Sequence, residues 1–279
     1  MTSWKDNNVL GSRRLVEEVL DLTSESEKVV AGNGAHLRKL IKDRIAEFGP
    51  NCDLNDIDVS HITDMSDLFY RSEFNGDISQ WDVSGVEDMS GMFYKSKFNG
   101  DISRWNVSNV VNMAAMFCQS KFNGDIAGWD VSKVRNMSWL FRESDFNNDI
   151  SNWDTSSTED MDFMFSGSQF SGDISKWNVS NVEDMSGMFY KSKFNRDISQ
   201  WDVSKVKDMY RMFCNSSFSG DISNWDVSNV VDMHKMFMSS KFNGDISKWD
   251  TSKVVDMTQM FVLSPLEGKE PDWYRDMFF

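Results

Sequence analysis

The sequence predicts an α/β repeat solenoid, with short parallel strands, one helical turn in each 24-residue coil and a cap at each end. Tryptophan recurs every 24 residues from Trp81 to Trp249 without an insertion or deletion, and Ile57 stands one period earlier. Around each of these residues the chain repeats the pattern W-D-V-S-x-V-x-D-M-x-x-M-F-x-x-S-x-F-N-G-D-I-S-x, which gives nine coils up to about Pro265. A fixed period of this length is typical of solenoids, because one coil buries its apolar side chains only by stacking on its neighbours.

The positions of a coil are numbered here from its tryptophan, which is position 0. Val86, Met89 and Phe93 have the spacing of one buried helical stripe, so they predict a helical turn over residues 86–94. Ser84 precedes this turn as a predicted N-cap, and a glutamate three residues later completes a capping box. Every coil is therefore expected to contain one short helical segment.

The remainder of each coil predicts a strand and a tight turn. Residues 81–83 alternate apolar, polar and apolar side chains, as a short strand does, and such strands line up in parallel in a solenoid. The F-N-G-D sequence at residues 98–101 predicts a tight turn, because Asn and Gly tolerate positive φ angles and an Asp side chain accepts local amide hydrogens.

The chain divides into an N-terminal helical cap at residues 1–50, the nine-coil solenoid at 51–266 and a C-terminal cap at 267–279. An amphipathic helix is predicted over residues 35–48, and residues 11–22 predict a further short helix. The apolar stripe of the first of these helices consists of Leu37, Leu40, Ile41, Ile45 and Phe48. The repeat pattern is expected to fail after Ser264, where an aromatic tail folds back. Such caps cover the apolar slice and the open strand edge at the ends of a solenoid.

The charge of the chain excludes some partners. With 44 acidic and 29 basic residues the net charge is -15, which argues against nucleic acid and against an anionic membrane surface. No apolar run is long enough to predict membrane insertion. The beginning of the sequence shows no signal peptide and no lipoprotein cysteine, so we expect a cytoplasmic monomer with a neutral or basic protein partner.

The sequence does not predict an enzyme or a cofactor. Its three histidines, His36, His61 and His234, fall on the N-terminal helix and at two unrelated repeat positions. Catalysis by a triad requires a nucleophile, a base and an orienting group that converge, and nothing in the repeat brings these residues together.

Two columns of identical residues have both a structural and a functional interpretation. The aspartates at position 20 recur in every F-N-G-D turn, and they could bind calcium or accept amide hydrogens within their own turn. The turn interpretation is favoured, because each coil offers calcium only one Asp and one Asn. The tryptophans could stack on a carbohydrate, but residues that recur at one apolar position are more often core. The aspartates are Asp77, Asp101, Asp125, Asp149, Asp173, Asp197, Asp221 and Asp245.

The string FNGDISQWDVSGVEDMSGMFYKS at residues 74–96 resembles the bacterial surface-protein repeat of the BspA-like and DUF285 families, which are related to leucine-rich repeats. The resemblance extends over residues 57 to about 266, and the segment before it resembles the lead into such arrays. It implies a leucine-rich-repeat-like, curved, parallel solenoid used for adhesion or protein recognition.

Recognition is expected where the coils differ from one another. Position 10 carries Trp139 and Phe163 in two adjacent coils, whereas the other seven coils have small, polar or charged residues there. Aromatic and arginine side chains are the usual anchors of protein interfaces, although these could also fill gaps between coils. The predicted partner-binding residues are Trp139, Phe163, Arg142, Glu143, Tyr190 and Tyr210. The sequence thus predicts a non-enzymatic binding scaffold, with a cytosolic neutraliser of an effector protein or a calcium- or carbohydrate-binding module as alternatives.

Overall fold

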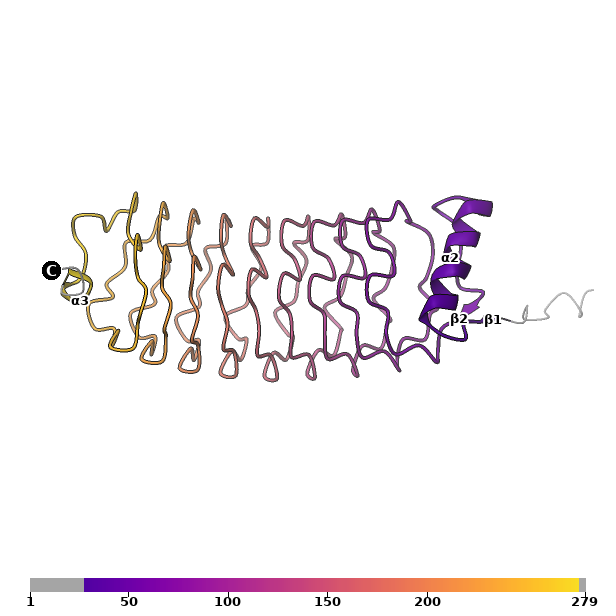
Figure 1. Ribbon diagram of the computed structural model, residues 1–279, viewed down its shortest axis with the longest axis horizontal. Coiled ribbons are helices and arrows are strands. Elements are labelled where there is room, and N and C mark those ends of the chain that lie inside the picture. The colour runs from indigo at the N-terminus through magenta and orange to yellow at the C-terminus, as the bar shows by residue number, and fades with distance from the viewer. Residues whose placement is uncertain (1–27, 276–279) are drawn as a thin grey trace, which may run out of the picture.

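The computed structural model describes residues 28–275, and Figure 1 shows them as an elongated stack of coils. The elements that have regular secondary structure are strand β1 (Val29–Val30), helix α2 (Gly34–Phe48), strand β2 (Ile57–Asp58) and helix α3 (Asp272–Arg275). Helix α2 lies at one end of the stack and α3 at the other (Figure 1). The helix predicted over residues 11–22 and the last four residues of the predicted C-terminal cap lie outside the described residues.

Helix α2 is the amphipathic helix that the sequence predicts at residues 35–48. Its N-cap Asn33 accepts a hydrogen bond from the backbone N–H of His36 at 2.9 Å, and it ends at Gly49, whose φ of 87° suits glycine. Leu37 and Ile41 are buried against the first coil and belong to the same core as the coils. Strand β1 pairs in parallel with β2, so the segment before α2 adds one more layer to the stack.

The coils stack in register, as the 24-residue period predicts. Parallel bridges join position 7 of each coil to the same position of the next, from Asp64 and Asp88 to Asp232 and Asp256. The tryptophans form a buried column: Trp81 is 4% exposed, its ring stacks on that of Trp105 at 6.4 Å, and each indole donates to the backbone carbonyl 27 residues earlier in the chain. The core interpretation of the tryptophans is therefore confirmed.

The helical turn predicted over residues 86–94 is wrong, because this segment is a series of β-turns. The N–H of Met92 donates to the carbonyl of Met89 three residues earlier, whereas the N–H of Phe93 donates to Met116 in the next coil at 2.9 Å. Alternate N–H groups that a helix would use internally thus bond between coils. Positions 10 and 14 adopt left-handed backbone, for example Gly91 with a φ of 61° and Lys95 with a φ of 53°.

The strand predicted at residues 81–83 and the N-cap predicted at Ser84 are also wrong. Trp81 and Val83 are buried and Asp82 is exposed, as the alternation requires, but no ladder forms there. The carboxylate of Asp82 accepts the N–H of Ser84 at 3.0 Å and bends the chain into an Asx turn. The side chain that was expected to start a helix instead belongs to a turn.

Most backbone hydrogen bonds of the turn segment point one way along the stack, whereas others point back, as from the N–H of Glu87 to the carbonyl of Thr63 in the preceding coil at 2.8 Å. The N–H groups at positions 8, 10, 12 and 14 of each coil donate to the following coil, as Gly91 does to Ala114 at 2.8 Å. At the end where carbonyls remain free, Arg38 of α2 donates to the carbonyl of Ser66 at 2.6 Å. At the opposite end the carboxylate of Glu267 accepts the N–H of Leu263 at 3.0 Å. In these four rows, the free carbonyl end therefore meets a positive charge and the free N–H end a negative one.

The repeat extends further than the sequence analysis predicted. Trp273 lies 24 residues after Trp249, and its indole donates to the carbonyl of Ile246 at 3.0 Å as in the earlier coils. The two rings stack at 6.4 Å. The change of pattern after Ser264 is thus a divergent part-coil, and the tryptophan spacing in the sequence already indicated it.

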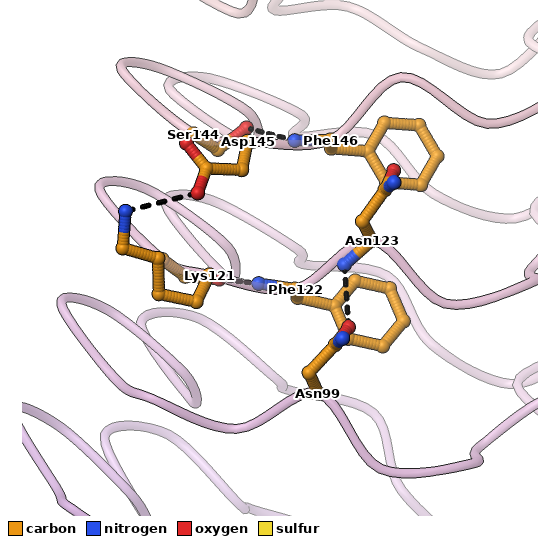
Figure 2. A network of polar contacts seen from close by, with 8 residues as sticks. Asn99, Lys121, Phe122, Asn123, Ser144, Asp145 and Phe146 are labelled. Atoms are coloured by element: carbon orange, nitrogen blue, oxygen red, sulfur yellow. Dashed lines mark hydrogen bonds and ion pairs between the residues drawn. The ribbon is translucent and has the colours of Figure 1, made fainter.

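Side chains close the tight turns of the coils (Figure 2). The carboxylate of Asp101 accepts the N–H of Ser103 at 2.9 Å, and the other aspartates of position 20 accept the amide two residues on in the same way. The side-chain oxygen of Asn99 accepts the N–H of Asn123 in the next coil at 2.7 Å. The turn interpretation of the position-20 aspartates is confirmed.

Candidate functional site

The predicted binding residues lie on one surface of the stack, which we call the turn face and define as positions 9, 10, 13 and 14 of the nine coils. In the coil of Trp81 these positions are Ser90, Gly91, Tyr94 and Lys95. The backbone rows that join successive coils hold equivalent positions side by side. Large side chains in neighbouring coils therefore come into contact across the coil boundary.

Trp139, Arg142 and Phe163 form one end of the candidate site. The rings of Trp139 and Phe163 lie 5.8 Å apart, centroid to centroid, with planes tilted by 55°. The guanidinium carbon of Arg142 lies 4.1 Å from the centroid of Trp139 and 5.7 Å from that of Phe163. The structure thus brings together three predicted residues as a cation–π cluster across two coils.

The cluster continues through the next two coils. Tyr190 meets the ring of Phe163 edge-on at 6.5 Å, and the guanidinium carbon of Arg211 lies 5.9 Å from the ring of Tyr190 and 4.9 Å from that of Tyr210. Trp139, Arg142, Phe163, Tyr190, Tyr210 and Arg211 together form what we call the aromatic strip. Arg211 was not among the predicted residues, although its place at position 10 could have indicated it.

The members of the aromatic strip are half-buried rather than fully exposed. The ring of Phe163 lies directly over Gly187, where a Cβ atom would stand only 2.3 Å from the ring. Glu143, the remaining predicted residue, is exposed at the edge of the strip, 3.5 Å from the guanidinium of Arg142, and it accepts from Gln119 at 2.5 Å. The residues therefore combine packing between coils with an accessible outer surface.

Comparison with known proteins places the chain in a family. The family model described as "Mycoplasma protein of unknown function, DUF285" matches residues 37–145, 118–217 and 191–266. The chain belongs to the DUF285 family. No curated protein and no solved structure matches it. The matched segments begin in α2 and include every residue of the aromatic strip.

In this DUF285 chain, a carboxylate that sequence reasoning missed holds one ring of the strip. The indole N–H of Trp139 donates to the carboxylate of Asp162 at 3.0 Å. Burial raises the pKa of Asp162 to about 6, and the nearby Asp160 and Asp184 act in the same direction. The other coils have Ser, Ala, Tyr, His or Thr at this position. The aspartate at position 162 is therefore an exception that could have been found in the sequence.

Both arginines of the strip leave a buried donor without a partner. Among the described residues, the Nε atoms of Arg142 and Arg211 are buried and make no hydrogen bond. Arg211 also forms no ion pair within residues 28–275, and the one ion pair of Arg142 is the long one to Glu143. Because buried polar atoms are usually satisfied, these two arginines and Gln119, whose Oε1 is also buried without a partner, differ from the other described residues.

The calcium and carbohydrate sites that the sequence analysis considered find little support among the described residues. Within residues 28–275, no group of three or more His, Cys, Asp or Glu side chains is placed to hold a metal ion. The tryptophan column is buried and its indoles already donate to carbonyls, so it offers no ring for a carbohydrate to stack on. Over the same residues, neither helix is long and apolar enough to cross a membrane.

Proposed function

We propose that this DUF285 chain is a non-enzymatic scaffold that recognises a protein partner through the aromatic strip. The observation that supports this most is the strip itself, in which six aromatic and arginine side chains from four successive coils form one continuous surface. Tryptophan, tyrosine and arginine are the residues that most often dominate the binding energy of protein interfaces. Adhesion and the neutralisation of an effector protein would both use such a surface.

The stack does not require the strip, which favours binding over packing. The coil of Trp105 forms the same backbone turns and the same rows of hydrogen bonds with Ala115 and Cys118 at the corresponding positions. Trp139 and Phe163 have φ angles of 60° and 49°, a conformation that is unfavourable for bulky residues and in which glycine is free of strain. Large rings at these positions therefore work against the local backbone preference.

The rest of the molecule suits a rigid, leucine-rich-repeat-like solenoid that is capped at both ends and monomeric. Phenylalanine columns fill the core, as in the stacking of Phe93 on Phe117 at 5.6 Å. Leu37 and Ile41 of α2 cover the first coil, and Trp273 covers the last tryptophan. Covered ends suppress the end-to-end pairing to which open strand edges are prone.

Affinity capture from a lysate of the source organism tests the proposal with matched variants. Residues 86–99 and 182–195 are identical in sequence, so Tyr94 has the same local sequence as Tyr190 but lies outside the strip. A protein captured by the unmodified chain should be lost with Tyr190→Ser and kept with Tyr94→Ser. Serine occurs at this position in Ser166, so the fold tolerates it. Equal capture by both variants, or equal loss, would contradict the proposal.

A further inference from the structure

The turn face carries a charge opposite to that of the whole chain. Over the nine coils it has six basic and three acidic residues, although the net charge of the chain is -15. The acidic residues are Asp67, Glu143 and Asp162. The basic residues are Arg71, Lys95, Arg142, Lys191, Arg211 and Lys235. The expectation of a neutral or basic partner comes from the net charge of the whole chain. Most of the carboxylates that produce this charge lie outside the turn face, for example the position-20 aspartates of the tight turns.

Rings hold both arginines of the strip in place, and only Arg142 also has a carboxylate partner, Glu143 at 3.5 Å. Arg211 lies over Tyr190 and Tyr210, and Arg142 lies over Trp139 and Phe163. The Nε atom of each arginine is buried, so the terminal Nη atoms are the donors that a partner can reach, although Nη2 of Arg142 already lies 3.5 Å from Glu143. A guanidinium fixed in this way loses little conformational entropy when it pairs with a carboxylate, and its planar fork matches carboxylate geometry.

We infer that the aromatic strip binds an acidic peptide segment of its protein partner. Two carboxylates of the segment pair with Arg142 and Arg211, and an apolar side chain between them rests on Phe163 and Tyr190. This inference rests on the proposed function and specifies the chemistry of its partner. The charge surplus of the turn face supplies the complementary field, which salt should screen.

A labelled peptide tests the inference without knowledge of the partner. The probe is a fluorescein-labelled peptide of alternating Glu and Phe, and matched peptides carry Gln or Lys in place of Glu. Binding to the full chain is measured by fluorescence polarisation at low and at high salt. We expect the Glu peptide to bind at least about tenfold more tightly than the other two, with weaker binding at high salt.

Variants then locate the binding on the chain. Arg142→Ser and Arg211→Ala use residues that other coils carry at the same positions, in Ser166 and Ala115. Each should weaken binding of the Glu peptide about tenfold, whereas Lys95→Ala, a turn-face cation outside the strip, removes only a long-range charge and should weaken it by less than about twofold. Equal binding of the Glu and Lys peptides, no effect of the arginine variants, or no binding of any peptide would overturn the inference. Capture that still depends on Tyr190 in that case would leave the proposed function standing with a partner of different chemistry.

Discussion

Two segments of this molecule have the same sequence but different surroundings. Residues 86–99 and 182–195 are identical over fourteen positions, and both have the same left-handed glycine, Gly91 with a φ of 61° and Gly187 with a φ of 57°. The first segment follows a coil that places the flexible side chain of Asp67 against its glycine, whereas the second follows a coil that places the ring of Phe163 there. In a stack of coils, the contacts of a repeat sequence are therefore set by the neighbouring coil and not by the repeat sequence alone.

The coils that follow the two segments differ in the same way. Asp88 of the first segment receives a hydrogen bond at 3.0 Å from the side-chain amide of Asn112 in the next coil. The identical Asp184 of the second segment lies beside Asp208, whose pKa burial raises to about 6 with help from Asp184 and Asp232. One amide in place of a carboxylate thus turns a repulsive contact between coils into a hydrogen bond.

The largest expected difference between the segments is in the effect of adding one methyl group. Gly187→Ala places a Cβ atom 2.3 Å from the ring of Phe163, so it should lower the free energy of unfolding by ~2–3 kcal/mol through overpacking and backbone strain. Gly91→Ala places its Cβ atom 2.1 Å from a carboxylate oxygen of Asp67, which can rotate away, so it should cost about 1 kcal/mol. Urea unfolding measures both values. If the two costs are equal, Phe163 does not control the surroundings of the second segment; if they differ as expected, Phe163→Gly should rescue Gly187→Ala.

Asp208→Asn should make the second segment resemble the first. Asparagine keeps the oxygen that accepts the N–H of Tyr210 at 2.8 Å, and its amide can donate to Asp184 as Asn112 does to Asp88. A shift of the pKa from 3.8 to about 6 corresponds to ~3 kcal/mol, which solvent screening at this half-exposed site reduces to a stabilisation of ~1–2 kcal/mol at neutral pH. Asp221→Asn, in the exposed turns, is the control and should give no gain. A loss of stability in Asp208→Asn would contradict this account.

The pH dependence of stability should also separate the two surroundings. The pKa values of Asp162 and Asp208 are raised to about 6, so their contribution to stability is complete below pH 3.8 and is lost as the pH rises through 6. The melting temperature should therefore increase as the pH falls from about 7.5 to 5. Below that range it should decrease, because exposed aspartates such as Asp101, whose pKa is lowered by the amide of Ser103, become protonated.

The double variant Asp162→Asn/Asp208→Asn should lose most of that increase between about pH 7.5 and 5, whereas Asp101→Asn should keep it. An unchanged pH profile in the double variant would mean that these two carboxylates do not interact with their neighbours as the geometry indicates. Differential scanning fluorimetry across the pH range is sufficient for the comparison.

The smallest expected difference between the segments is in the loss of stability when their tyrosine is replaced by serine. Tyr94 stacks on Tyr70 at 5.0 Å and Tyr190 meets Phe163 at 6.5 Å, so each serine variant removes one ring–ring contact and the cation–π contacts of that ring, which for Tyr190 include Arg211. Each should lower the free energy of unfolding by ~1 kcal/mol, with a difference between them of less than about 0.5 kcal/mol. A much larger loss for Tyr190 alone would show that the strip is structural.

The sequence predicts the period of this fold well and its local geometry poorly. The spacing from Trp81 to Trp249 correctly predicts the stacking and the buried column, because stacking in this register buries each tryptophan of the series. The helical turn over residues 86–94 is wrong because left-handed backbone at positions 10 and 14 turns alternate amides towards the next coil. A pattern of apolar spacings within one coil does not contain that information, since it depends on hydrogen bonds between coils.

For the candidate site, the sequence likewise predicts most of the residues but not the contacts that they make between coils. Departures at position 10 identify Trp139 and Phe163, and nearby variable residues identify four more positions, of which three join the strip. The hydrogen bond from Trp139 to Asp162 was missed because it joins position 10 of one coil to position 9 of the next, 23 residues away in the sequence. Arg211 was missed because its importance comes from two tyrosines in different coils.

The central claim is that the aromatic strip is a surface added to a stack that folds without it. The free energy of unfolding of Phe163→Gly tests this most directly. Loss of the half-buried ring is offset by the relief of a φ of 49°, so we expect a value within about 1 kcal/mol of the unmodified chain. A loss of ~3 kcal/mol or more, as for a core phenylalanine, would contradict the claim and make the strip part of what holds the coils together.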